Sequence, residues 1–208
     1  MRKITIFVTC IVLSSGARAV DARAEPGETP RRADLSLQTG IVLPQVSSGL
    51  GTALGVKLDA GLRVWSGLSV FVAVGYSQPA VDHSLSDPRL TADAYTTSSK
   101  QRELTLTTGL VWRFLPMTAK LNVYAALGAK AYLLETITSG SSGGQSFGEN
   151  RETSTRFGAA VLGGLEYRLG PGALCSELEL GGSDLPHLIT GDVATTAFEL
   201  TLGYRLLF

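Results

Sequence analysis

Hydrophobic and polar residues alternate with a period of two along most of this chain. The last twelve residues, 197–208, show the pattern clearly. The apolar positions there are Phe198, Leu200, Leu202, Tyr204, Leu206 and Phe208. Glu199, Thr201, Gly203 and Arg205 stand between them. Because side chains alternate between the two faces of a β-strand, this pattern predicts a strand with one oily and one polar face.

The same alternation recurs in eight segments. They cover roughly 34–44, 54–65, 67–77, 101–115, 119–137, 152–169, 172–182 and 195–208. Most are about 10 residues or longer, whereas strands of soluble sheets have a mode of about 5–6 residues. A strand that crosses a membrane needs about 9–11 residues. Length and period therefore both favour membrane-spanning strands.

The connections between these segments alternate between short and long. The short ones are 65–67, 115–118 and 170–172, and the long ones are 44–53, 78–100, 138–151 and 183–194. In an up-and-down meander, alternate connections lie at the same end of the sheet, as in outer-membrane barrels. The sequence thus predicts an all-β protein, an eight-stranded antiparallel up-and-down transmembrane β-barrel. Ten strands are possible if residues 78–100 form an extra hairpin.

Two of the long connections carry further expectations. The stretch "TSGSSGGQSFGEN", residues 138–150, is rich in Ser and Gly and is expected to be a flexible loop tip. The stretch "SDPRLTADAYTTSSK", residues 86–100, is expected to continue the barrel strands as a hairpin above the membrane. An exposed strand edge there would suit an extracellular partner that binds by strand addition.

The N-terminus has the features of a secretory signal peptide. A basic start, Met1–Lys3, precedes an apolar run of about ten residues and a small-x-small site at Ala17–Ala19. We expect residues 1–19 to be the signal peptide, with cleavage after residue 24 as the alternative. Residues 20–33 then form a disordered polar lead, and residues 34–208 form the barrel domain.

Composition narrows the function classes. The chain has 18 basic and 18 acidic residues, so no overall charge favours nucleic acid. Of two cysteines, Cys10 lies in the signal and Cys175 remains alone, so a disulfide framework is not expected. Outside the signal no run of about 18 apolar residues exists, which argues against a transmembrane helix.

The polar face of the strands carries balanced charges. They are Lys57, Asp59, Arg63, Glu103, Arg113, Lys130, Glu166, Arg168, Glu177, Glu179, Glu199 and Arg205. An eight-stranded barrel has an interior that side chains just fill, and an unpaired charge there is costly. We therefore expect these residues to form a structural charge network that plugs the lumen. The alternatives are a narrow channel for small solutes, or a soluble lipocalin-like ligand binder whose charged face is its wet exterior.

The C-terminal strand resembles the insertion signature of bacterial outer-membrane proteins, which alternates to a terminal Phe. Tyr204, Leu206 and Phe208 carry this resemblance. Together with the signal, strand count and loop asymmetry, it makes residues 34–208 similar to the small OmpA/OmpX-like and opacity-protein-like barrels of Gram-negative bacteria. The resemblance implies an outer-membrane location, a monomer, contact with outer-membrane lipid and lipopolysaccharide, and recognition by the barrel-insertion machinery.

Candidate chemistry is sparse. His83, near Asp82, Ser84 and Asp87, invites comparison with a hydrolase, and His187 has no clear partner. A catalytic triad is defined by geometry across the fold and not by neighbours in sequence. We therefore expect no catalytic residue, no metal and no cofactor, with a lipid A-modifying enzyme as an alternative. The expected role is structural or surface recognition through the long extracellular loops.

Overall fold

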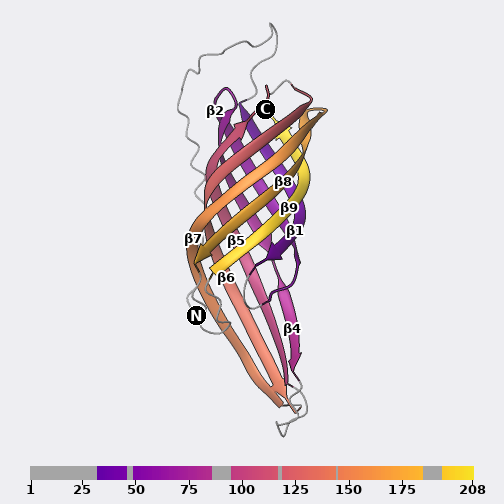
Figure 1. Ribbon diagram of the computed structural model, residues 1–208, viewed down its shortest axis with the longest axis vertical. Helices are drawn as coiled ribbons and strands as arrows, with labels where there is room; N and C mark the ends of the chain where they lie inside the picture. The colour runs from indigo at the N-terminus through magenta and orange to yellow at the C-terminus, as the bar shows by residue number, and fades with distance from the viewer. Residues whose placement is uncertain (1–31, 46–48, 86–94, 117–118, 144, 185–193) are drawn as a thin grey trace.

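The chain forms a β-barrel built only from antiparallel pairs (Figure 1). The computed structural model describes residues 32–45, 49–85, 95–116, 119–143, 145–184 and 194–208. The strands are β1 (Ala33–Pro44), β2 (Ala53–Trp65), β3 (Leu68–Ser77), β4 (Ala80–Leu85), β5 (Tyr95–Arg113), β6 (Leu121–Ser142), β7 (Gln145–Leu169), β8 (Gly172–Asp184) and β9 (Ala194–Leu207). Residues 1–31, which hold the expected signal peptide and most of the polar lead, lie outside the described residues.

The barrel closes as a ring of eight strands. The strand order is β3-β2-β1-β9-β8-β7-β6-β5-β4, and β3 also pairs with β5. The first strand pairs with the last in the register Asp34↔Leu207 to Pro44↔Ala197. β4 follows β3 after Gln78 and Pro79 and pairs with β5 beyond the end of β3. The expected eight-stranded barrel is therefore confirmed, because β4 prolongs β3 and adds no ninth strand to the ring.

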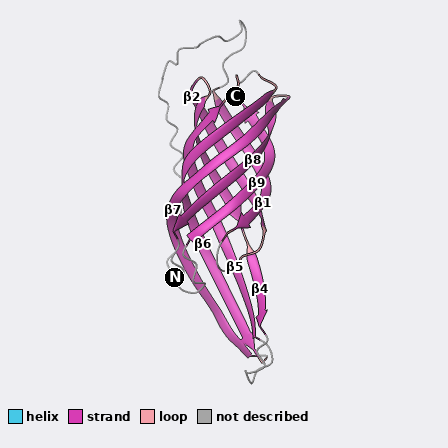
Figure 2. Ribbon diagram, in the orientation of Figure 1, coloured by secondary structure: helices cyan, strands magenta, loops and turns pink. Residues whose placement is uncertain are grey.

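Three strands are far longer than a membrane crossing requires. β5, β6 and β7 have 19, 22 and 25 residues. With β4 they continue past one end of the barrel as a four-stranded sheet, the lower part of Figures 1 and 2. We call this sheet, residues 80–85, 95–100, 137–142 and 145–151, the extension. The end of the barrel from which it projects is the loop end, and the opposite end is the turn end.

The extension corrects one expectation and partly confirms another. Residues 138–142 and 145–150 form paired strands instead of a flexible loop tip. The rings of Tyr95 and Phe147 pack at 5.7 Å between centroids. Residues 95–100 continue the barrel strand as expected, whereas residues 86–94 of the same stretch lie outside the described residues.

The oily face of the strands points outward, and the polar face points into the lumen. Along β2, buried and exposed positions alternate from Ala53 to Leu62. Outward residues, one from each strand of the ring, are Leu37, Leu58, Val72, Leu110, Leu127, Val161, Leu178 and Leu200. The soluble-barrel alternative is therefore wrong, since it requires these side chains inside. No helix among the described residues is long and apolar enough to span a membrane.

Tight turns at the turn end depend on glycine. Gly67, between β2 and β3, has φ 79°, and Gly170, between β7 and β8, has φ 61°. Both values lie in the left-handed region that glycine adopts without strain. These turns join neighbouring strands within a few residues, so nearly the full strand length remains available for the barrel.

Inside the barrel, one glycine makes room for an aromatic ring. A Cβ atom at Gly164 would lie 2.3 Å from the ring of Tyr124, which is itself 2% exposed. The neighbouring Gly163 faces outward, and a Cβ there would meet nothing within 4 Å. The absence of a side chain at Gly164 therefore permits Tyr124 to reach across the lumen.

We expect Gly164→Ala to destabilise the barrel by about 1–3 kcal/mol, because overpacking must displace the Tyr124 ring. The measurement is a urea titration of the protein in detergent, with folded protein detected by its faster gel migration before boiling. Gly163→Ala is the matched control and should leave the midpoint unchanged. Equal midpoints for the two variants would contradict this packing.

Candidate functional site

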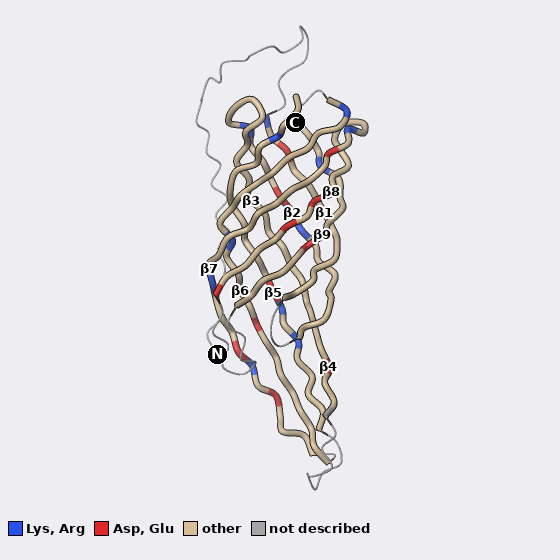
Figure 3. Tube along the Cα trace, in the orientation of Figure 1, with Lys and Arg blue, Asp and Glu red and all other residues tan. Residues whose placement is uncertain are grey.

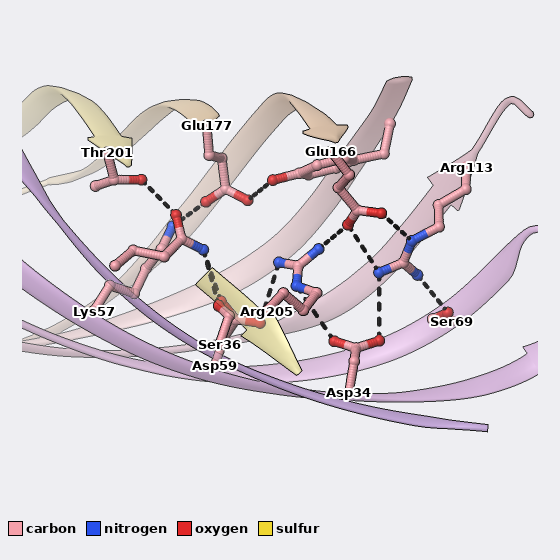
Figure 4. A network of polar contacts seen from close by, with 12 residues as sticks. Asp34, Ser36, Lys57, Asp59, Ser69, Arg113, Glu166, Glu177, Thr201 and Arg205 are labelled. Atoms are coloured by element: carbon pink, nitrogen blue, oxygen red, sulfur yellow. Dashed lines mark hydrogen bonds and ion pairs between the residues drawn. The ribbon is translucent and has the colours of Figure 1, made fainter. Parts of the chain in front are cut away.

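The lumen is filled by charged side chains that contact one another in clusters. Near the turn end, Arg205 of β9 lies among three carboxylates (Figure 4). Its guanidinium pairs with Glu166, with Asp59 at 3.3 Å and with Asp34 at 3.5 Å. The Arg205 side chain is 4% exposed. The three acidic partners offset part of the cost of removing the guanidinium from water, although its Nε makes no hydrogen bond.

Arg113 of β5 approaches the same acids from across the barrel. Its Nη2 lies 3.3 Å from Asp34 and 3.2 Å from Glu166, and its Nη1 donates to the Ser69 hydroxyl at 2.9 Å. Two guanidinium groups thus share the carboxylates of Asp34 and Glu166. Each carboxylate joins strands that are not neighbours in the ring, so the cluster ties opposite walls together.

A second cluster surrounds Lys57 of β2. Its ammonium group pairs with Glu177 and lies 3.2 Å from Glu179, both on β8. The Tyr124 hydroxyl donates to the other oxygen of Glu177 at 2.7 Å. Gln38 lies near this cluster and donates to Asp59 at 2.8 Å. The Tyr124 ring connects the second cluster to the first, because the guanidinium carbon of Arg205 lies 5.4 Å from its centroid.

The third cluster is centred on Lys130 of β6, nearer the loop end. Its ammonium group lies 2.6 Å from Glu179 and 2.9 Å from Glu199. It also lies 5.2 Å from the centroid of the Tyr132 ring. Glu103 is only 4% exposed, and no described basic group lies within ion-pair distance of it. In this part of the lumen, the carboxylates of Glu103, Glu179 and Glu199 therefore outnumber the ammonium group of Lys130.

The structure places most of the predicted lumen residues together. Nine of the twelve are buried: Lys57, Asp59, Glu103, Arg113, Lys130, Glu166, Glu177, Glu179 and Arg205. Glu199 is half-buried and pairs with Lys130. Arg63 and Arg168 are half-buried and lie at the turn end, one layer beyond the clusters. The contacts between these charged lumen residues form a connected network. The structural role of this network stays a prediction.

Sequence reasoning missed several members of this network. Asp34 pairs with both arginines, Gln38 is 1% exposed, and Tyr124 and Tyr132 are almost fully buried. The spacing along β6 was the available signal. Both tyrosines are an even number of residues from Lys130, so they share its face of the strand. Aromatic residues in a barrel strand are usually assigned to the lipid interface, which conceals the two that point inward.

Apolar side chains occupy another part of the lumen. Phe71, Ala73, Val111, Tyr124, Ala126, Ala160 and Leu162 form a buried cluster contributed by β3, β5, β6 and β7. Between this cluster and the charged residues remains a cavity of about 10 Å³. A site needs about 10–15 Å³ to hold one water molecule. This cavity is therefore about the size of one water molecule.

A larger cleft lies outside the barrel, on the extension. Its volume is about 410 Å³, and strands β4, β5, β6 and β7 all contribute to it. The lining residues are Asp82, His83, Ser84, Thr96, Thr97, Ser98, Ser139, Gly140, Ser141 and Ser146. Hydroxyl groups dominate, and no described lysine or arginine lines the cleft.

The candidate residues that the structure describes in β4 do not all share one face of the strand. His83 lies opposite Thr97 in β4, while Asp82 and Ser84 point to the other face of the strand because they are its neighbours. Asp87 and His187 lie outside the described residues. Among the described residues, no group of three or more His, Cys, Asp and Glu could hold a metal ion.

The C-terminal strand is held along its whole length. The backbone N–H of Phe208 donates to the Ala33 carbonyl at 2.8 Å, and the N–H of Arg32 donates back to the Phe208 carbonyl at 2.7 Å. The Tyr204 hydroxyl donates to the Leu169 carbonyl at 2.7 Å. Leu206 and Phe208 are 39% and 64% exposed. The side chains of the expected insertion signature lie on the outer surface of the turn end.

A closed ring with an oily exterior and a charged interior defines a transmembrane β-barrel of the bacterial outer membrane. The model of one family, the outer membrane protein beta-barrel domain, matches residues 7–205. The chain therefore belongs to the family of outer membrane protein beta-barrel domains. The resemblance inferred from the terminal strand and the loop asymmetry is confirmed at this level.

Two solved structures with TM-scores above 0.5 show the same fold, and a third with a lower score is also similar. The chain is similar to a major outer membrane protein of Thermus thermophilus, with 14% identity, TM-score 0.53, and coverage of 84% of this chain and 99% of that one. OprG of Pseudomonas aeruginosa gives 9% identity, TM-score 0.52, and coverage of 86% and 97%. Neisserial surface protein A gives 18% identity, TM-score 0.49, and coverage of 85% and 97%. No curated protein sequence matches significantly.

We expect Arg205→Met to lower the free energy of unfolding by about 3–5 kcal/mol, because it leaves Glu166, Asp59 and Asp34 buried around a missing cation. The urea titration monitored by gel migration measures this loss. Arg102→Met is the control, since Arg102 pairs with Glu135 at 3.1 Å but its side chain is 50% exposed. An exposed pair contributes at most about 1 kcal/mol. Similar losses in both variants would contradict a structural network.

Proposed function

We propose that this protein is a non-enzymatic surface-recognition barrel, in which the lumen is a structural plug and the extension carries the binding site. The single observation behind this proposal is the uneven distribution of open space. The cavity between the charged and apolar side chains of the lumen has a volume of about 10 Å³, whereas the cleft on the extension offers about 410 Å³. Of these two spaces, only the cleft is large enough for a ligand.

The orientation in the membrane supports an extracellular extension. Outer-membrane barrels have short turns on the periplasmic side and long connections outside. The short turns that join β2 to β3 and β7 to β8 lie at one end, and the extension lies at the other. An outward ion-pair network, in which Glu135 pairs with Arg102 at 3.1 Å and with Arg151 at 2.8 Å, stands where the oily belt ends. Charges of this kind suit the level of the lipid headgroups, with the extension beyond them.

The chemistry of the cleft favours an uncharged, hydroxyl-rich ligand. Each Ser or Thr hydroxyl can both donate and accept a hydrogen bond, as sugar hydroxyls do. In the cleft, the hydroxyls of Thr96 and Ser141 lie 2.7 Å apart across neighbouring strands, so the sheet presents them side by side. Asp82 adds a carboxylate acceptor, and the lack of a described cation in the lining disfavours an anionic ligand. We therefore propose a neutral glycan as the ligand class.

Surface recognition can be tested with the full chain in lipid nanodiscs on an array of neutral and acidic glycans. We expect retention of neutral glycans, and a loss of at least tenfold when Ser98→Val and Ser139→Val are combined, because two adjacent hydroxyls become methyl groups. Thr153→Val and Thr155→Val together form the control, since both lie on the exposed face of β7 and do not line the cleft. Retention of no neutral glycan, or equal retention by both double variants, would refute the recognition site.

The plugged lumen makes a separate prediction about conductance. In planar bilayers with molar KCl, the protein should show no stable ion-conducting steps, because packed side chains leave no continuous water path. Glu103→Gln, which changes a lumen charge, should leave this record unchanged. Regular steps whose size changes with Glu103→Gln would instead support the narrow small-solute channel.

The enzymatic alternative rests on His83 and is open to a direct measurement. His83 and Ser84 point to opposite faces of β4, which disfavours a Ser–His pair. Overproduction of the protein should leave the mass spectrum of lipid A the same as that from cells that overproduce His83→Ala. A mass change that requires His83 would establish a lipid A-modifying enzyme and overturn the non-enzymatic proposal.

A further inference from the structure

The cleft on the extension opens on the same face of the sheet as the lipid-facing side chains. β5 and β6 pair without a bulge along the whole of β5, so every second residue of β5 lies on one face. Leu106 is exposed on the lipid-facing side, and Ser98 and Thr96 share its face because they lie at even spacing from it. Ser98 lies opposite Ser139, and Thr96 lies opposite Ser141. These four cleft residues therefore belong to the outward face.

The rest of the lining agrees with this placement. Asp82 of β4 lies opposite Ser98, and Ser146 of β7 lies opposite Ser141. Ser84 shares the face of Asp82, two residues before it. With the four residues above, these three bring the outward members of the lining to seven of ten, and the others alternate with them along the same strands: His83, Thr97 and Gly140. The cleft thus opens beside the barrel, in line with its oily wall, and not above the lumen.

Three cations stand on this outward face between the oily wall and the cleft. Arg102 and Arg151 share the carboxylate of Glu135, at 3.1 Å and 2.8 Å. Arg151 also lies 4.0 Å from Glu149. Lys100 is exposed, and no carboxylate of the described residues lies within ion-pair distance of it. Three cations against two carboxylates leave an excess of positive charge at the base of the extension.

The outward face therefore changes character in a fixed order from the membrane to the tip. In Figure 3, blue and red segments mark the part of the extension next to the barrel, and its far end is tan. At about 3.3 Å per residue, Ser98 lies about 13 Å beyond Arg102, and Thr96 lies about 20 Å beyond it. Oily side chains, cations and hydroxyl groups follow one another along β5. Acyl chains, phosphate and sugars follow one another in the same order along a phosphate-bearing glycolipid.

We propose that the cleft binds the sugar chain of a phosphate-bearing glycolipid that lies in the same leaflet as the extension. This inference rests on the proposed function and names the source of its neutral glycan. The cations at the base bind the phosphate, since arginine forms two parallel hydrogen bonds with phosphate oxygens. The cleft binds sugars that lie farther from the lipid. A free glycan makes no contact with those cations, and a phospholipid without sugars does not reach the cleft.

Anchoring in the same leaflet also raises the occupancy of a site whose intrinsic affinity is weak. A second contact made by an already tethered ligand occurs at an effective concentration on the order of millimolar. A cleft that binds a free sugar weakly is therefore filled by a glycolipid that stands beside it. This difference separates a ligand in the same membrane from a glycan in solution or on another membrane.

The test uses the full chain in phosphatidylcholine nanodiscs and a fluorescent form of the neutral oligosaccharide that the glycan array retains most strongly. Binding is followed by anisotropy. The same oligosaccharide, coupled to phosphatidylethanolamine so that the phosphate is kept, is then placed in the same nanodisc as the protein. We expect this glycolipid to weaken binding of the labelled sugar at least tenfold. The same amount in separate, protein-free nanodiscs should compete no better than the free oligosaccharide.

Variants at the base of the extension separate the phosphate contact from the cleft. Lys100→Gln combined with Arg102→Gln should reduce competition by the same-disc glycolipid at least threefold, because the phosphate loses two cations, while the labelled sugar binds as before. Lys120→Gln combined with Arg168→Gln is the matched control, since it removes two charges at the turn end and should change neither measurement. Arg151→Gln serves instead if the first variant does not fold.

The possible failures are distinguishable. If no free oligosaccharide binds, the proposed recognition site fails, and this inference fails with it. If the labelled sugar binds but the same-disc glycolipid competes no better than the glycolipid in separate nanodiscs, this inference fails alone. Equal competition by phosphatidylglycerol, which has a phosphate and no sugar chain, would assign the effect to lipid headgroups and refute it. An equal loss of competition in both double variants would refute the phosphate contact at the base of the extension.

Discussion

The closure of β9 onto β1 is the constraint on which the rest of this structure depends. In lipid, each unpaired backbone N–H or C=O costs several kcal/mol, so a sheet in the membrane can have no open edge. Here the register runs unbroken from Asp34↔Leu207 to Pro44↔Ala197, and Phe208 adds hydrogen bonds at the turn end. Closure fixes the number of strands in the ring, and that number fixes the width of the interior.

A narrow interior explains why charges and glycines occur together inside. Arg205, Arg113 and Lys130 reach far across the lumen, and each finds acids on strands that are not its neighbours. Long side chains need space opposite them, and Gly164 provides it for Tyr124. The charged side chains therefore make contacts between walls, and the apolar cluster around Phe71 occupies another part of the lumen.

The sequence predicts the strands of the barrel and their outward oily face, but it does not predict the polar strands of the extension or the ion-pair partners in the lumen. The period of two, the segment lengths and the loop asymmetry predicted eight strands, their direction and the outward oily face. β5 and β6 also continue through polar segments, where hydrophobic and polar residues no longer alternate. Hydrophobicity alone therefore does not reveal that Thr96, Ser98 and Ser141 belong to strands. Partners such as Arg113 and Asp34, 79 residues apart, depend on the barrel stagger, which the sequence pattern does not specify.

The two ends of the barrel differ because at the loop end the sheet leaves the membrane, and there its strands need not form a closed ring. At the turn end, tight turns such as the one at Gly67 keep the chain close to the ring, so variation is confined to side chains at the mouth. At the loop end, β5, β6 and β7 leave the membrane and can pair as an ordinary sheet in water. Backbone groups there can bond to solvent, so open edges are tolerated and short hydroxyl side chains suffice. The proposed recognition site therefore lies on the extension, where the sheet is not constrained by closure of the ring.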